Sequence, residues 1–424
     1  MMHHFLFRFR SYRPLAKGYL MSACAFIWRR LMFRTTFVTI TGSVGKSTAT
    51  ACLGSILSAH YPTNWEPGGR NSRLALAGIV LKTRFRHRFT VIEVGTRTPG
   101  ALARASWMIA PDITVLLRVL SVHTNAFPTI EAMAAEKEQL LKRLGRRGVA
   151  ILNADDPVVL DMGRRRPGPV YTFGVSEGAF LSADQVSAVW PARLSFRARC
   201  GQELTRVETN LVAEHQLPSV LAALTTAVHA GISLPAAAAV LKSVQPVAGR
   251  MQPMVLPNGA TIIRDDFIAT AVSVQAGLDF LAGIQAARRI VVVGDVLDSG
   301  LSVRPRAREL GRRVAQAADM AVFLGSEADC AAKSAVASGM APGSARAFKR
   351  LPAAFEFLKA ELRAGDMVLT EGWQGRHIER VILAQFGEIA CWMERCPKLV
   401  PCDYCPDLKL VAFPAISRAG AGDS

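Results

Sequence analysis

Acidic residues are absent from the start of this chain: the first one is Glu66, although seven Lys and Arg side chains occur among residues 1–35. Aromatic residues are scarce, at 7% of the 424 residues, so a base-stacking surface is disfavoured and no nucleic-acid partner is expected. The apolar run from Gly18 to Trp28 is shorter than the ~20 residues that cross a bilayer. No signal-peptide cleavage site and no internal repeat are evident, so we expect no export.

The chain does contain enough apolar side chains to bury a sizeable core. Hydrophobic residues make up 50% of it, and its length suits two or three domains of ~100–200 residues each. The formal net charge of +18 favours anionic partners, such as nucleotides or a membrane surface. An arginine-rich proteome would explain the same charge, and the sequence leaves both explanations open.

Residues 1–35 form a basic and apolar segment for which two structures are open. An amphipathic helix could lie on an anionic membrane, which would hold a cytoplasmic protein peripherally on the inner face of that membrane. The alternative is a helix that is packed on the body of the protein.

The eight cysteines fall into two groups. Four are scattered among apolar neighbours and are interpreted as buried reduced thiols, which indicates a reducing cytosol: Cys24, Cys52, Cys200 and Cys330. The other four lie close together near the end of the sequence and could enclose a structural Zn²⁺ ion: Cys391, Cys396, Cys402 and Cys405. Four reduced thiols in a loosely packed tail are the alternative.

A glycine-containing loop between an apolar β-branched run and a helical pattern predicts a phosphate site. Two glycines let the backbone approach an anion, and the following helix directs free N–H groups toward it. A lysine can reach the β- and γ-phosphates, and the next hydroxyl can bind Mg²⁺. Ile40 replaces the first glycine of the usual pattern, so the loop is a shortened variant. It comprises Thr41, Gly42, Ser43, Val44, Gly45, Lys46, Ser47 and Thr48.

Apolar strand patterns alternate with helical patterns along most of the chain, which predicts α/β domains with parallel sheets. We expect a central ATP-binding domain over residues 36–247, a C-terminal Rossmann-like domain over 248–388 and a Cys-rich tail over 389–424. Short alternating segments between Tyr171 and Val212 indicate an antiparallel hairpin region. The expected strands are Phe37–Ile40, Thr90–Val94, Ile113–Leu117, Val149–Leu152, Thr261–Ile263, Ile290–Val293, Met320–Leu324, Ala345–Phe348 and Met367–Leu369. The expected helices are Ala49–Leu57, Arg73–Leu81, Ile130–Leu144, Ser219–Ala230, Val272–Leu281, Pro305–Ala318, Ala328–Ser338, Pro352–Leu362 and Arg376–Phe386.

An ordered set of motifs over about residues 36–388 resembles the Mur ligase family, and within it the branch that adds D-alanyl-D-alanine to a UDP-N-acetylmuramoyl-tripeptide. Besides the phosphate loop, these motifs are Glu93-Val94-Gly95, Pro111-Asp112-Ile113, His123, Glu136-Lys137, Asn153-Ala154-Asp155-Asp156, Glu214-His215-Gln216, Gly249-Arg250, Asp265-Asp266-Phe267, Gly294-Asp295-Val296-Leu297-Asp298-Ser299-Gly300 and Glu371-Gly372. The resemblance implies an ATP-dependent amide ligase: a carboxylate attacks the γ-phosphate, and an amine then attacks the resulting acyl phosphate. The family's N-terminal substrate-binding domain is not found, because only a short segment precedes the loop.

The resemblance also implies roles for single residues. Lys46, Glu93, His123 and Lys137 would be catalytic, with Mg²⁺ held by Ser47, Glu93 and His123 and by a carbamate on Lys137. Asn153 and His215 would lie near the nucleotide base, Asp265 at the ribose and phosphate end, and Arg250 would be the interdomain arginine. From the residues alone, a strand-end carboxylate, an isolated histidine, a solvated helix lysine and ordinary hydrogen bonding at a domain interface are the alternatives.

Two departures from the branch concern the incoming amine. Its Asn-Ala-Asn is Ile268-Ala269-Thr270 here, and its Lys-Gly-Ser is Glu371-Gly372-Trp373. The Asn-rich segment of the branch survives only loosely, around Asn64 and Asn71. We therefore expect retained ATP chemistry on small or nucleotide-linked carboxylates and amines, with an amine other than D-Ala-D-Ala. A cyanophycin-type poly-amino-acid ligase and a degenerate nucleotide-binding scaffold are the alternatives.

Overall fold

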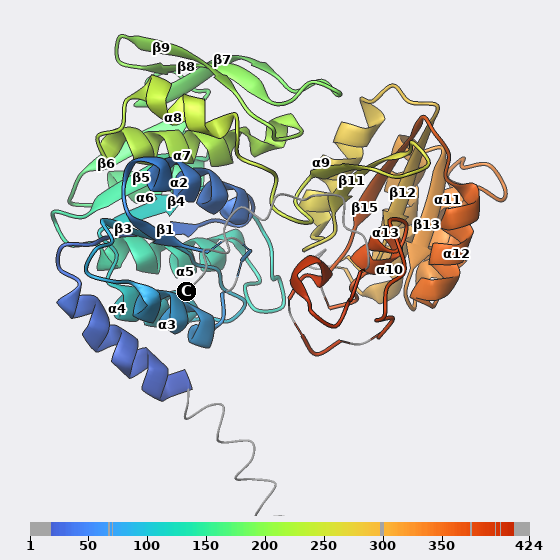
Figure 1. Ribbon diagram of the computed structural model, residues 1–424, viewed down its shortest axis with the longest axis horizontal. Helices are drawn as coiled ribbons and strands as arrows, with labels where there is room; N and C mark the ends of the chain where they lie inside the picture. Colours follow the sequence, from blue (N-terminus) through green and yellow to red (C-terminus); the bar gives the residue numbers. More distant parts are fainter. Residues whose placement is uncertain are drawn as a thin grey trace, which may run out of the picture. The chain divides into compact units, whose positions relative to one another are not determined.

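The computed structural model describes residues 18–66, 68–69, 71–296, 301–373, 375–394, 396–398 and 400–410. The chain divides into two compact units, Met1–Val247 and Ala248–Ser424. Each is an α/β unit with its own sheet (Figure 1).

The first unit has a nine-stranded sheet in the order β2-β3-β1-β4-β5-β6-β7-β8-β9. Neighbouring strands from β2 to β7 pair in parallel, and β7, β8 and β9 pair antiparallel, so the expected hairpin region is confirmed for these last three strands. The strands are β1 (Thr36–Thr41), β2 (Thr63–Trp65), β3 (Phe89–Glu93), β4 (Ile113–Leu116), β5 (Val149–Asn153), β6 (Val170–Gly174), β7 (Leu181–Ser187), β8 (Ser195–Cys200) and β9 (Glu203–Glu208).

Helices cover both faces of this sheet. Alternate residues of β1 point to opposite faces, so β1 contributes apolar side chains to a core on each side. Val38 and Ile40 enter one apolar core with α2 and α7, whereas Phe37 enters another with α3 and α4. Figure 1 shows α2 and α7 on one side of β1 and α3 and α4 on the other. The helical elements are α2 (Lys46–His60), α3 (Arg73–Lys82), α4 (Ala101–Ile109), α5 (Ile130–Arg143), α6 (Pro157–Arg164), η1 (Glu214–Gln216), α7 (Leu217–His229) and α8 (Leu234–Leu241).

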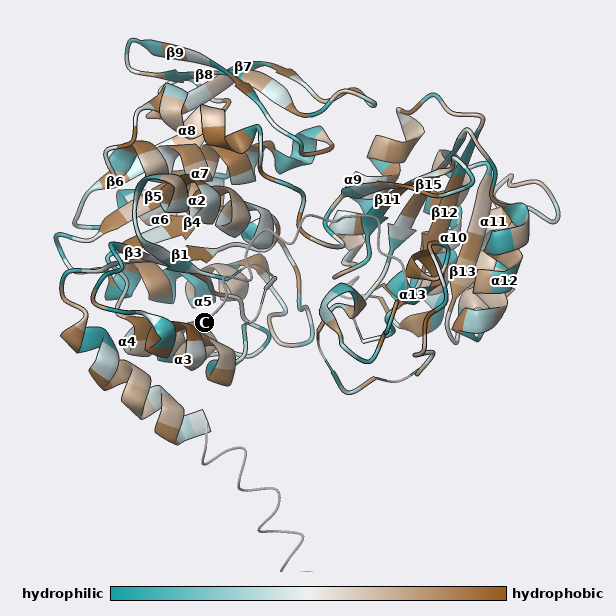
Figure 2. Ribbon diagram, in the orientation of Figure 1, coloured by the Kyte–Doolittle hydropathy of each residue, from teal (hydrophilic) through white to brown (hydrophobic). Residues whose placement is uncertain are grey.

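Residues 18–31 form a helix on the α3–α4 side of the first unit. Ala25 is buried, and the buried Arg29 donates from Nε to the Ile109 carbonyl oxygen at 2.8 Å and from Nη2 to Asp112 at 2.9 Å. One face of this helix is therefore packed on the body of the protein, as the second of the two alternatives predicted. The other face exposes Leu20 and Ile27, with 67% and 61% of their surface accessible, and Figure 2 shows apolar segments along this helix. Among the described residues, no helix is long and apolar enough to cross a membrane, and residues 1–17 lie outside them.

The second unit has a six-stranded sheet in the order β10-β11-β15-β12-β13-β14, parallel except for β10. Its strands are β10 (Gln252–Val255), β11 (Thr261–Asp265), β12 (Arg288–Val293), β13 (Met320–Leu324), β14 (Ala345–Phe348) and β15 (Asp366–Glu371). Its helical elements are α9 (Ala271–Ala282), α10 (Val303–Ala317), α11 (Ala328–Ala337), α12 (Leu351–Glu361), α13 (Glu379–Leu383) and η2 (Cys402–Tyr404).

One predicted helix of this unit is much too long. The sequence pattern predicts a helix over Arg376–Phe386, but α13 covers only Glu379–Leu383. His377 has φ 50°, a left-handed conformation that a right-handed helix cannot include, so the helix begins after it.

Candidate functional site

The loop between β1 and α2 has the geometry of an anion cradle. Gly42 and Gly45 have φ 155° and 81°, and an added Cβ at Gly45 would lie 2.5 Å from Ser219 Oγ, so a larger residue does not fit there. Helix α2 begins at Lys46, and no side chain caps its N-terminus. Its first N–H groups therefore stay available to an anion.

The side chains of the loop agree with this interpretation. Lys46 Nζ donates to the carbonyl oxygens of Gly42 at 2.9 Å and Ser43 at 3.4 Å, so its ammonium group lies against the loop. The buried hydroxyl of Thr41 has no hydrogen-bond partner among the described residues. Ser43 fixes the loop to the segment after β4, because its Oγ accepts from Leu120 N at 2.9 Å. A nucleotide phosphate fits a cradle of this kind, with backbone donors, a cation and an unused hydroxyl.

A chain of hydrogen-bonded polar side chains lies beside the loop. Ser47 Oγ donates to Glu93 Oε2 at 2.8 Å, and Glu93 is 7% exposed at the end of β3. Asn71 Nδ2 donates to Glu93 Oε1 at 3.2 Å, while Asn71 Oδ1 accepts from Gly95 N at 3.0 Å. Because parallel strands end at one edge of a sheet, β3 carries its carboxylate to the loop after β1. Serine and glutamate oxygens suit Mg²⁺, and Asn71 orients the carboxylate.

Lys137 is buried in the first unit, with 2% of its surface accessible on α5. Burial, and then the charge of Lys46, lower its pKa from 10.5 to about 7, with Glu136 acting in the opposite direction. An ordinary lysine is almost wholly charged at neutral pH, and the lowered pKa increases the uncharged fraction of Lys137. An uncharged amine is the form that can react with CO₂ to give a carbamate. The alternative of a solvated helix lysine is wrong, because the side chain is buried.

Glu136, the neighbour of Lys137, has a structural role. Its carboxylate accepts from Gly100 N at 2.7 Å and from Leu102 N at 2.8 Å, at the start of α4. It therefore stabilises the N-terminus of that helix.

The remaining predicted residues of the first unit occupy loops and strand ends. His123 has φ 57° in a turn after β4, where its carbonyl oxygen accepts from Ala126 N and Phe127 N. Asn153 ends β5 and is 1% exposed, with Oδ1 accepting from Asp155 N at 3.0 Å. His215 lies in η1, directly before α7.

In the second unit, three carboxylates gather where β11 and β15 end. Asp265 pairs with Glu371 across the two strands, and Asp266 accepts from Thr370 Oγ1 at 2.8 Å. Burial raises the pKa of Asp265 to about 7, against the opposing effect of Arg250. Burial first, and then Asp265 and Asp266, raise the pKa of Glu371 well above its usual range. Neither carboxyl oxygen of Glu371 has a hydrogen-bond partner among the described residues, which agrees with a burial that favours the neutral form of this acid.

The four tail cysteines do not form one group. Among the described residues, the three-residue set whose ligand atoms lie within 4.8 Å of one another is His377, Glu379 and Cys402. Cys391, Cys396 and Cys405 are not part of this set, so the four sulfurs are not gathered as a single four-cysteine site would require. The physical reason is that Cys402 is buried against α13, in an apolar cluster with Leu383.

The structure therefore brings four of these side chains together at the loop: Lys46, Ser47, Glu93 and Asn71. The charge of Lys46 also lowers the pKa of Lys137. Sequence reasoning did not assign Asn71 to the site. The loose Asn-rich match was the signal that could have indicated Asn71. Its hydrogen-bond partner Gly95 lies 24 residues further along the chain, so the contact depends on the fold.

Comparisons with known proteins agree with this geometry. A family model described as the Mur ligase middle domain matches residues 40–227, and a second, described as the Mur ligase glutamate ligase domain, matches residues 249–373. The UDP-N-acetylmuramoyl-tripeptide–D-alanyl-D-alanine ligase of Mycobacterium tuberculosis is 28% identical over 377 residues, which are 84% of this chain and 74% of that protein. The enzyme of the same name from Treponema pallidum is 24% identical over 343 residues, which are 81% and 72% of the two chains.

Solved structures resemble the fold as a whole. A crystal structure of MurF from Acinetobacter baumannii matches with a TM-score of 0.78 at 24% identity, over 88% of this chain and 80% of that one. MurF ligase from Thermotoga maritima, in complex with ADP, matches with a TM-score of 0.74 at 22% identity, over 86% and 82%. The two matched domains, the ordered motifs and the shared fold agree. This chain belongs to the Mur ligase family of ATP-dependent amide ligases.

Proposed function

We propose that the chain joins a carboxylate to an amine in the synthesis of a cell-wall peptide, with ATP bound at the loop of residues 41–48. The observation that carries this proposal is the hydrogen-bonded chain from the buried Ser47 and Glu93 to the half-buried Asn71 beside that loop. The relatives support cell-wall peptide synthesis and do not favour a poly-amino-acid ligase or a scaffold. Bound ATP would supply the phosphoryl group that activates the carboxylate.

The proposed roles follow the geometry of each unit. Gly42, Gly45 and Lys46 would bind the phosphates, with Thr41, Ser43, Val44 and Thr48 completing the loop. Ser47 and Glu93, with His123 and a carbamate on Lys137, would hold Mg²⁺. Asn153, His215, Arg250 and Asp265 would bind the rest of the nucleotide. The proposed domain bounds stay at 36–247 and 248–388, with a tail from 389.

We also propose that the amine is not D-Ala-D-Ala. Thr270, where the branch has Asn, is used as the cap of α9: its Oγ1 accepts from Ser273 N at 3.2 Å. Glu371, where the branch has Lys, is a buried carboxyl group. Neither position offers the polar group that the branch would present to its amine.

The test is ATP-dependent phosphate release with UDP-N-acetylmuramoyl-tripeptide and a panel of amines. We expect release to require both substrates, with D-Ala-D-Ala at least roughly tenfold poorer in kcat/KM than the best amine, because lost hydrogen bonds weaken transition-state binding. If D-Ala-D-Ala is the best amine, the proposed change of amine substrate is wrong. If phosphate release does not depend on the acid and the amine, the proposed ligase activity is wrong.

We propose in addition that the exposed face of residues 18–31 binds an anionic lipid surface. Leu20, Ile27 and Leu31 are exposed along one side of this helix, and no acidic residue occurs before Glu66. Each basic residue near such a surface contributes ~1 kcal/mol, and salt screens that contribution.

Vesicles containing phosphatidylglycerol should therefore co-sediment with the protein at low salt and release it as ionic strength rises, while phosphatidylcholine vesicles should not bind. Ile27→Ser should weaken this binding. Val255→Ser, at an apolar residue of the second unit that is 66% exposed, should leave it unchanged. Failure to bind anionic vesicles at low salt would overturn the proposal.

A further inference from the structure

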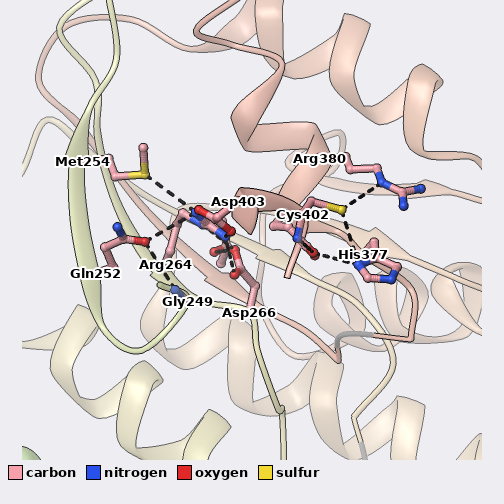
Figure 3. A network of polar contacts seen from close by, with 11 residues as sticks. Gly249, Gln252, Met254, Arg264, Asp266, His377, Arg380, Cys402 and Asp403 are labelled. Atoms are coloured by element: carbon pink, nitrogen blue, oxygen red, sulfur yellow. Dashed lines mark hydrogen bonds and ion pairs between the residues drawn. The ribbon is translucent and has the colours of Figure 1, made fainter. Parts of the chain in front are cut away.

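Three buried side chains with metal-binding atoms meet where the tail packs on the second unit. His377 lies in the turn after β15, Glu379 is the first residue of α13, and Cys402 is the first residue of η2. They are 1%, 3% and 2% exposed, and one ligand atom from each lies within 4.8 Å of the others. Figure 3 shows His377 and Cys402 directed toward one another.

Hydrogen bonding fixes which nitrogen of His377 carries a proton. Its Nε2 lies 3.0 Å from the carbonyl oxygen of Lys398, and a carbonyl oxygen only accepts, so Nε2 is the donor. In a neutral ring, Nδ1 then has a lone pair and no hydrogen. This lone pair is directed at Glu379 Oε1, 2.8 Å away, and at Cys402 Sγ, 3.4 Å away. Nitrogen, oxygen and sulfur thus face one another without a hydrogen that the neutral ring could donate.

The carboxylate of Glu379 is also incompletely used. Its Oε1 accepts from Cys402 N at 3.2 Å, but its buried Oε2 has no hydrogen-bond partner among the described residues. A buried carboxylate oxygen without a partner is costly, and a cation would remove that cost.

We propose that His377 Nδ1, Glu379 and Cys402 Sγ bind a Zn²⁺ ion. Imidazole nitrogen, carboxylate oxygen and thiolate sulfur are the ligands that zinc takes in proteins. With bonds of ~2.0 and ~2.3 Å at a tetrahedral angle, nitrogen and sulfur ligands lie about 3.5 Å apart. The observed 3.4 Å between Nδ1 and Sγ matches this separation, and the glutamate oxygen has to move outward by about half an ångström.

The surroundings of the cluster support the same assignment. A zinc-bound histidine ordinarily donates its other N–H to a carbonyl or carboxylate, which is what His377 does toward Lys398. Arg380 Nε donates to Cys402 Sγ at 3.1 Å, a contact that stabilises a thiolate. The ion would join the tail to the turn after β15 and to α13, with the second oxygen of Glu379 or a water molecule as its fourth ligand.

The main competing arrangement is an ion pair between a doubly protonated His377 and Glu379, in which Nδ1 donates and no metal is bound. It leaves Glu379 Oε2 without a partner. A site built from the four tail cysteines is the other competitor, and the two can be separated from the proposal by experiment.

The test uses the full chain, purified without chelators and measured for metal by inductively coupled plasma mass spectrometry. We expect about one zinc ion per chain. After exchange with Co²⁺, the protein should show a thiolate-to-cobalt charge-transfer band. Cys402→Ser and His377→Gln should each lower the metal content at least roughly tenfold, and Cys402→Ser should abolish the band. Two control variants should keep the wild-type metal content and the cobalt band: Cys330→Ser, a matched cysteine change on α11, and Cys405→Ser.

Circular dichroism separates loss of the ion from loss of the fold, and His377→Gln provides a second variant if Cys402→Ser does not fold. Full-length protein without a bound transition metal, and without a cobalt band, supports the ion pair and overturns the proposal. Unchanged metal content in His377→Gln, with loss of the metal in Cys405→Ser, supports the four-cysteine site and equally overturns the proposal.

Discussion

Lys46→Ala should lower ATP turnover by at least ~10³-fold while the chain stays folded. Preorganised charge at a transferring phosphoryl group is usually the largest catalytic contribution, and one lost donor already costs ~10²–10³. Lys46 is the cation that the loop itself holds in place, through the carbonyl oxygens of Gly42 and Ser43. A second effect has the same direction: the charge of Lys46 lowers the pKa of Lys137, so its removal leaves less uncharged Lys137.

Phosphate release, measured with saturating substrates, checks this expectation. Lys142→Ala is the matched control, because Lys142 lies on α5 with an exposed side chain paired with Glu138. Its activity and its melting temperature should both stay close to those of the wild type. If the Lys46 variant releases phosphate at the wild-type rate, the loop is not part of the catalytic site.

Lys137→Met should lower activity on the order of a hundredfold, because Mg²⁺ would lose an oxygen ligand that only a carbamate on this lysine supplies. Methionine is the preferred replacement, since it fills the buried space without a buried charge. Short-chain carboxylic acids should partly restore Lys137→Ala, because they replace the missing oxygens. Protein incubated with ¹³C-bicarbonate should show a carbamate carbon signal by NMR that is absent from Lys137→Met.

The pH dependence of this effect follows from the pKa of about 7 for Lys137. The lysine must lose its proton before it reacts with CO₂, so at an equal concentration of dissolved CO₂ the CO₂-depleted enzyme should recover faster at pH 8 than at pH 6. Full activity of Lys137→Met without added acids would reject the carbamate. Recovery that keeps rising about tenfold per pH unit up to pH 9, at equal dissolved CO₂, would show that a lysine with an ordinary pKa is responsible.

Local patterns predicted most of the architecture, because parallel strands such as β12 are buried on both faces and appear as continuous apolar runs. The phosphate loop was also predictable, since its glycines, lysine and hydroxyl are adjacent in the chain. Helices α4, α6 and α8 were missed: they have 9, 8 and 8 residues, too few for a periodic pattern to be distinctive.

Other parts of the site could not be predicted, because they depend on tertiary contacts. The burial of Lys137 is invisible in a helix window that contains several charged residues. The cysteines near the end of the sequence suggested a site by spacing alone, whereas Cys402 meets His377 across 25 residues of chain. The short α13 follows from the left-handed His377, a conformation that no propensity indicates.

The position of Asp403 makes folding of the second unit depend on the order of synthesis. Arg264 is 1% exposed and is held by two carboxylates, Asp266 and Asp403 (Figure 3). Asp266 is made almost at once, but Asp403 follows Arg264 by 139 residues. At ~5–20 residues per second, the ribosome needs on the order of ten seconds to deliver it. During that time the guanidinium group of Arg264 lacks its second counter-charge, so burial of β11, which carries it, is less favourable. The tail therefore supplies the last counter-charge of this buried arginine, and a chain that ends before Asp403 lacks it.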